Sequence, residues 1–102
     1  MESFEITKFK NGSYEVNTSK LFDAFNSLHP KNNSDNFIAE NASLNLNVFL
    51  KNAKEAFNRN CLLMIDNKEI CNANSLLDWF SEYGTEEFQA EMTKRFHAIF
   101  SE

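Results

Sequence analysis

The fold of this chain is decided by the stretch FEITKFKNGSYEV at residues 4–16. Apolar and polar residues alternate over 4–9 and again over 13–17, which is the period of a half-buried strand. Asn11-Gly12 stands between the two segments, and this dipeptide is the strongest short-range signal for a tight hairpin turn because both residues tolerate a positive φ. The sequence therefore predicts a hairpin with strands at 4–9 and 13–17.

A helix is expected directly after this hairpin. The hydroxyl of Thr18 or Ser19 can accept from the free amides of a first helical turn. Apolar residues then recur at helical spacing over 21–28. The helix is expected to end at His29-Pro30, because a residue that precedes proline is pushed out of the α region.

A second hairpin and two more helices are expected later in the chain. Residues 61–65, CLLMI, form an apolar run of strand length, residues 66–68 turn the chain, and 69–71 return it. Ser75 and Asp78 fit a capping box, Gly84 can close that helix in the left-handed conformation, and Thr85 can cap the last helix. The expected buried stripes are Leu76, Trp79, Phe80 and Tyr83 in the first of these helices, and Phe88, Met92, Phe96, Ile99 and Phe100 in the second.

The middle of the chain allows two interpretations. Residues 31–36 are polar and read as a surface loop. Residues 43–50 alternate apolar and polar side chains, which favours a strand, but 46–57 carry a longer helical stripe. We choose a helix over 43–58, with Ser43 as its cap.

A faint internal repeat relates the two halves at an offset of 55 residues. Val16–Phe25 aligns with Cys71–Phe80 and shares four identities, and the two hairpin turns share the same offset. The repeat indicates either two ββα units related by pseudo-twofold symmetry or independent reuse of the same residue types. Either way, the sequence predicts a single α+β domain over 1–102, with a small, mostly antiparallel sheet from two hairpins and about four helices in the order ββα–α–ββ–αα.

Composition is typical of a globular domain. The 102 residues are 42% hydrophobic with a mean hydropathy of -0.49, which is enough for one core. No apolar run approaches the roughly 20 residues of a membrane span, and residues 1–5 lack the features of a secretory signal. We therefore expect a cytoplasmic protein in which Cys61 and Cys71 stay reduced and act as small apolar side chains.

Acidity is concentrated in one segment. The formal net charge is -5, and Glu69–Thr93 holds six acidic residues without one Lys or Arg. Part of this has a local explanation, because Glu91 can pair with Lys94 and Arg95, and acids in a first turn favour the helix dipole. Glu82 has no basic neighbour in sequence. The candidate partner-binding residues are Asp78, Glu82, Tyr83, Glu86, Glu87 and Glu91.

Catalytic and metal-binding patterns are weak. His29 and His97 stand far apart without a carboxylate or nucleophile at a useful spacing, and two glycines cannot form a phosphate loop. Cys61 and Cys71 lack the spacing of a zinc site. The sequence therefore predicts a protein that is not an enzyme and uses no cofactor and no metal.

The acidic segment favours a protein-binding function. A surface of one sign attracts a basic partner and repels nucleic acid. We expect an inhibitor or immunity protein that neutralises a basic, nuclease-type toxin. The alternative is a DNA-binding or regulatory module of phage or mobile-element origin, because residues 11–21 resemble the hairpin-into-helix stretch of KilA-N-type DNA-binding domains; nucleic-acid binding is the less expected of the two.

Overall fold

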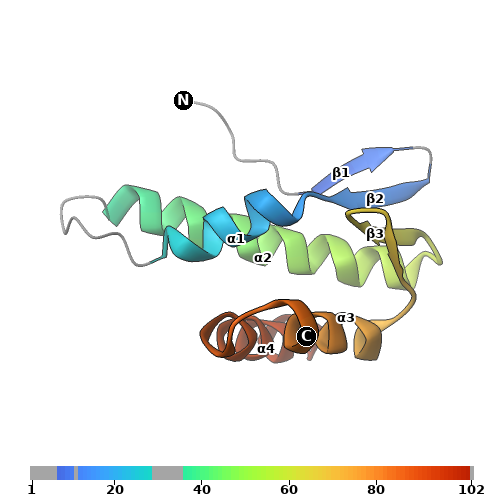
Figure 1. Ribbon diagram of the computed structural model, residues 1–102. Coiled ribbons are helices and arrows are strands. Elements are labelled where there is room, and N and C mark those ends of the chain that lie inside the picture. The colour runs from blue at the N-terminus through green and yellow to red at the C-terminus, as the bar shows by residue number, and fades with distance from the viewer. Residues whose placement is uncertain (1–6, 11, 29–35, 102) are drawn as a thin grey trace.

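The computed structural model describes residues 7–10, 12–28 and 36–101, and the side chains of 12–28 and 37–101 (Figure 1). Within these ranges the fold is α+β, and its elements follow the predicted order. They are β1 (Thr7–Lys10), β2 (Ser13–Val16), α1 (Thr18–Asn26), α2 (Asn36–Asn58), β3 (Leu62–Ile65), β4 (Lys68–Ile70), α3 (Ala73–Tyr83) and α4 (Glu86–Phe100). The predicted strand residues 4–6 and the predicted helix end at His29-Pro30 lie outside the described residues.

The sheet is mixed. Its order is β1-β2-β3-β4, with two antiparallel hairpins joined by a parallel β2–β3 pair that sets Val16 opposite Ile65. The prediction of a mostly antiparallel sheet overlooked this joint. Because α1 and α2 carry the chain back to its starting end, β3 runs in the same direction as β2.

Both hairpin turns use positive φ angles. Gly12 has a φ of 80°, and Asp66 and Asn67 have φ angles of 47° and 72°. Two consecutive positive φ values belong to the tight turns whose twist matches that of the flanking strands. Gly12, Asp66 and Asn67 therefore lie in turns as predicted, whereas Lys68, predicted as a turn residue, already belongs to β4. Asn11 lies outside the described residues.

One face of the sheet is buried against helices. Val16, Leu63, Ile65 and Ile70 are buried, whereas Glu15 on the other face is exposed. Figure 1 shows α1 and α2 alongside each other above the α3–α4 pair, with the sheet at the C-terminal half of α2. The sheet and the helices packed on this face enclose one hydrophobic core.

Asparagine caps two of the helices. The Asn17 side chain accepts from the Lys20 amide at 3.3 Å, and the Asn72 side chain accepts from the Ser75 amide at 2.9 Å. The predicted caps at Thr18 or Ser19 and the predicted capping box of Ser75 and Asp78 are therefore wrong. Each helix begins earlier than expected, because a preceding asparagine satisfies the free amides as well as a hydroxyl does.

The cap of α4 is confirmed. The Thr85 hydroxyl accepts from the Phe88 amide at 3.2 Å. Gly84, just before it, has φ -100° and ψ 163°, so the predicted left-handed conformation is wrong. Position 84 has no room for a side chain, which accounts for the glycine. A Cβ there would stand 2.8 Å from the carbonyl oxygen of Phe80 and closer still to the Phe88 ring.

The long helix α2 starts at Asn36, seven residues before the predicted start at Ser43. The strand alternative for 43–50 is wrong. Leu46 belongs to the buried face of α2, while Leu44 and Val48 are exposed on the other side. The alternating apolar residues in 43–50 thus lie on two different faces of one helix. The cap predicted at Ser43 is wrong, because Ser43 lies within that helix.

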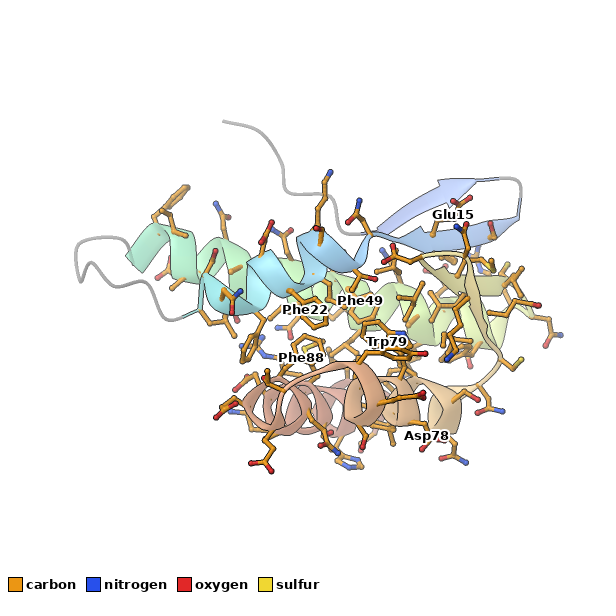
Figure 2. All side chains as sticks on the ribbon, viewed as in Figure 1. Glu15, Phe22, Phe49, Asp78, Trp79 and Phe88 are labelled. Carbon is orange, nitrogen blue, oxygen red and sulfur yellow. The ribbon has the colours of Figure 1, made fainter. Side chains whose placement is uncertain are left out.

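Aromatic side chains fill the space between α1, α3 and α4. Phe88 is at the centre, with ring centroids 4.8 Å from Phe22, 5.3 Å from Phe25 and 5.8 Å from Phe80 (Figure 2). Most of these pairs meet edge to face, the geometry that aromatic quadrupoles prefer. Of the predicted stripe residues, Tyr83 is exposed rather than buried.

The secondary-structure elements repeat at the same 55-residue offset as the sequence. Adding 55 to the bounds of β1 reproduces those of β3, and the capping residues Asn17 and Asn72 are equivalent. The equivalent strands run in opposite directions, however, and exposed Glu15 corresponds to buried Ile70. The second unit is displaced by two strands along the sheet, so the two units do not form the pseudo-twofold arrangement that we considered.

Candidate protein-binding surface

Asp78 and Glu82 share the outer side of α3. They are four residues apart, hence one turn apart, and both are exposed. Leu76 and Phe80 hold the opposite side of α3 in the core. Figure 2 shows Asp78 pointing away from the body of the molecule.

Glu86 and Glu87 open α4 and are also exposed. Thr85 sets the start of the helix, so both carboxylates lie in its first turn, where the helix dipole stabilises an acid by about 0.3–1 kcal/mol. Glu87 also lines an open groove of about 670 Å³ together with Phe25 and Asn26 of α1. Glu86 and Glu87 therefore continue the acidity of α3 across the Gly84–Thr85 link.

Glu91 differs from the other acids because it pairs with Arg95, the residue that joins α4 to α2. Its carboxylate accepts from Arg95 Nε at 2.6 Å and lies 3.6 Å from Lys94 Nζ, which confirms the pairing predicted from the sequence. Arg95 Nη1 then donates to the Ser43 hydroxyl at 2.9 Å and to Asn47 Oδ1 at 3.1 Å.

The pKa of Glu91 reflects this network. Partial burial raises the pKa of the carboxyl, but the hydrogen bond from Arg95 and the charges of Arg95 and Lys94 outweigh it and leave the pKa below its ordinary value. A carboxylate that holds an arginine bridging two helices contributes to the fold. Because its charge is already paired with Arg95 and Lys94, Glu91 is less suited to binding a partner than the other predicted acids.

Glu82 has a basic neighbour that the sequence did not reveal. Lys68 in β4 donates to the Tyr83 hydroxyl at 2.8 Å. This hydrogen bond raises the pKa of Lys68, desolvation lowers it, and the carboxylate of Glu82 adds a further rise. Glu82 therefore has a lysine charge nearby, because the second hairpin brings Lys68 to the end of α3, but no ion pair joins these two described side chains.

Four of the six predicted residues are acids that make no ion pair in the part of the chain that the structure describes: Asp78, Glu82, Glu86 and Glu87. We call Asp78, Glu82, Glu86 and Glu87 the acidic face; it spans α3 and the start of α4. Such a face raises the local concentration of cations and speeds the approach of a basic surface.

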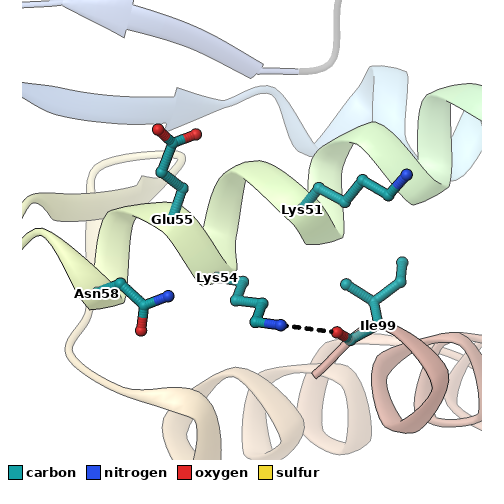
Figure 3. Close-up of a pocket in the computed structure, with 5 residues that line it drawn as sticks. All are labelled: Lys51, Lys54, Glu55, Asn58 and Ile99. Carbon is teal, nitrogen blue, oxygen red and sulfur yellow. Dashed lines mark hydrogen bonds between the residues drawn. The ribbon is translucent and has the colours of Figure 1, made fainter. Parts of the chain in front are cut away.

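A small basic hollow lies elsewhere, between α2 and the end of α4 (Figure 3). It encloses about 230 Å³ and is lined by Lys51, Lys54, Glu55, Asn58 and Ile99. Lys54 Nζ points to the carbonyl oxygen of Ile99 and donates to it at 3.1 Å. A cation at the C-terminal end of a helix stabilises its unpaired carbonyls, so this lysine has a structural role.

Cys61 and Cys71 are free thiols that line one hollow of about 260 Å³ beside β3 and β4. Cys61 is half-buried and Cys71 is exposed, so the expectation that both act as small apolar packing residues does not hold for Cys71. Among the described residues, no group of three or more His, Cys, Asp or Glu could hold a metal ion.

A surface that sequence reasoning missed lies on α2. Phe37, Ile38, Leu44 and Val48 are all exposed. The signal was present in the sequence as apolar residues at 37, 44 and 48, but the late predicted start of the helix hid it. None of the helices in the described residues has the length and apolarity needed to cross a bilayer.

Comparisons with protein-family models, with curated proteins and with solved structures give no match to this chain.

Proposed function

We propose that this chain is a non-enzymatic, cytoplasmic binding protein that docks its acidic face on a basic protein, as an inhibitor or immunity protein does on a nuclease-type toxin. The observation that carries the proposal is the exposure of Asp78, Glu86 and Glu87 without an ion pair among the described residues. A nuclease binds the phosphates of its substrate in a basic cleft, and an array of carboxylates on a rigid helix pair complements such a cleft.

Rigidity supports the same proposal. The acids stand on two helices whose inner sides hold Phe80 and Phe88 in the core, so little side-chain and backbone order has to be created on binding. Tyr83 adds an exposed aromatic ring next to Glu82, and tyrosine is enriched where interfaces derive most of their affinity. Its hydroxyl is already oriented by Lys68.

The experiment uses charge reversal with a matched control. Asp78→Lys combined with Glu86→Lys reverses two unpaired acids of the acidic face. Asp23→Lys combined with Glu15→Lys changes the net charge by the same amount at exposed acids on α1 and β2. Circular dichroism and thermal melting verify that both double variants fold, with up to about 1 kcal/mol lost at Glu86 through the helix dipole.

Binding is measured by calorimetric titration against the product of the adjacent reading frame, at low and high salt. We expect the acidic-face variant to lose about tenfold or more in affinity, the control to lose much less, and wild-type binding to weaken with salt. Equal losses in both variants, or wild-type binding that salt does not affect, would refute the proposal. Tight, salt-dependent binding of the wild type to duplex DNA would refute it in favour of a DNA-binding module.

A further inference from the structure

The N-terminal half of α2 carries an exposed apolar stripe on the side away from the core. Phe37 is 56% exposed, Leu44 62% and Val48 49%, and Ile38 beside them is 45% exposed. Ala42, Leu46 and Phe49 are buried on the other side of the same helix. Since 100° separates successive residues, the two sets lie roughly opposite each other around the helix axis. We call Phe37, Asn41, Leu44 and Val48 the α2 stripe.

The spacing of the α2 stripe is that of a coiled-coil seam. Its residues are separated by four, three and four positions, which places Phe37 and Leu44 at d positions and Asn41 and Val48 at a positions. A β-branched residue at a with leucine at d favours two parallel strands, and one asparagine at a fixes the register through its own copy. We infer that the α2 stripe is a self-association surface, on which a second copy of this chain docks α2 in parallel against α2.

The parallel arrangement is favoured by pairing. With a twofold axis along α2, each residue meets its own counterpart, so Asn41 meets Asn41 and the amides can bond to each other. An antiparallel arrangement that sets Phe37 against Val48 would instead set Asn41 against Leu44 and leave the amide without a partner. Leaving a polar group unpaired in an apolar contact is unfavourable, and this decides for the parallel form.

Charge does not oppose a second copy at this place. Between Phe37 and Val48 the only charged residue is Glu40. In the parallel register it flanks Asn45 of the other copy, so no like charges meet. The acidic face lies on α3 and α4, and the net charge of -5 is therefore carried largely by other elements.

Area sets the expected strength. Four half-exposed large side chains leave on the order of 400 Å² of apolar surface, as large as the largest patch on a typical monomer. Two such patches bury less than the roughly 1,200 Å² where stable interfaces begin, so the pair is expected to be weak and in exchange, with a dissociation constant on the order of 10–100 μM.

The test is sedimentation equilibrium of the full chain from about 5 to 500 μM. We expect wild type to shift from monomer to dimer in this range. Leu44→Lys should stay monomeric, because it places two ammonium groups in the seam, and Asn41→Leu should dimerise at least about tenfold more tightly. Leu62→Lys, the same change at a 39%-exposed leucine of the sheet, is the matched control and should dimerise as wild type does.

A crosslink tests the relative orientation of the two α2 helices in the dimer. In a chain with Cys61→Ser and Cys71→Ser, the substitution Val48→Cys should give a disulfide-linked dimer on mild oxidation, because position 48 meets itself only in the parallel form. Monomeric wild type at 500 μM, dimers that Leu44→Lys leaves intact, or failure of the position-48 crosslink in a sample shown to be dimeric would overturn the inference. Circular dichroism of each variant verifies that the monomer remains folded.

Discussion

Replacing Gly84 by alanine tests the packing between α3 and α4. A Cβ at this position would stand 2.8 Å from the carbonyl oxygen of Phe80 and closer to the Phe88 ring, and real side chains do not approach so near. The Phe88 ring would have to shift by about 1 Å, which disturbs its packing on Phe22 and Phe25, and overpacking of this kind costs about 1–3 kcal/mol. Alanine restricts the unfolded chain and offsets about 0.4–1 kcal/mol of that cost.

The expected net loss is about 1.3 kcal/mol in the free energy of unfolding, or roughly 5–10 °C in Tm. Urea titration followed by circular dichroism measures the free energy, with Tm as a second readout. Combining Gly84→Ala with Phe88→Leu gives a double-mutant cycle. Because the shorter leucine side chain can turn away from position 84, Gly84→Ala should cost at least about 1 kcal/mol less in the Phe88→Leu background.

A third substitution separates crowding from backbone conformation. Asparagine adopts the left-handed region far more readily than alanine, so it should be the milder replacement at Gly12, which has a φ of 80° and nothing within 4 Å of a built Cβ. At Gly84, crowding should make asparagine at least as damaging as alanine. If Gly84→Asn proves clearly milder than Gly84→Ala, the crowding argument fails and a left-handed cap is the better explanation.

Two further predictions concern the cap of α3 and the link between α2 and α4. Asn72→Ala should cost about 1 kcal/mol in the free energy of unfolding and Ser75→Ala less than about 0.5, because Asn72 holds the cap; the reverse order in urea titrations would restore the capping box. Glu91→Gln should cost about 1.5 kcal/mol at pH 7. Since the folded pKa of Glu91 lies below its ordinary value, its stabilisation is present above the ordinary pKa and is lost as the pH falls through the folded pKa. The difference from wild type should therefore shrink between pH 5 and pH 3, and a constant difference would show that the substitution removes packing rather than charge.

The sequence by itself determined the elements that depend on neighbours along the chain. The turn at Gly12, the apolar run at 61–65 and the cap at Thr85 are local signals, because a positive φ, a buried strand and a free amide are satisfied within a few residues. The pairing of Glu91 with Arg95 was likewise accessible, since one helical turn separates them. Even here, competing local signals misled, because Asn17 stands next to Thr18 and Asn72 stands three residues before Ser75.

Only the tertiary structure decided which residues meet across long separations. The hydrogen bond of Lys68 to Tyr83, the reach of Arg95 to Ser43 and the parallel β2–β3 pairing link residues 15 to 52 positions apart. No periodicity encodes such pairs, because they depend on how whole elements dock. The two apolar sides of α2 show the same limit: hydrophobic spacing marks both, and only the packing of α1, α4 and the sheet determines which side is buried and which is left at the surface.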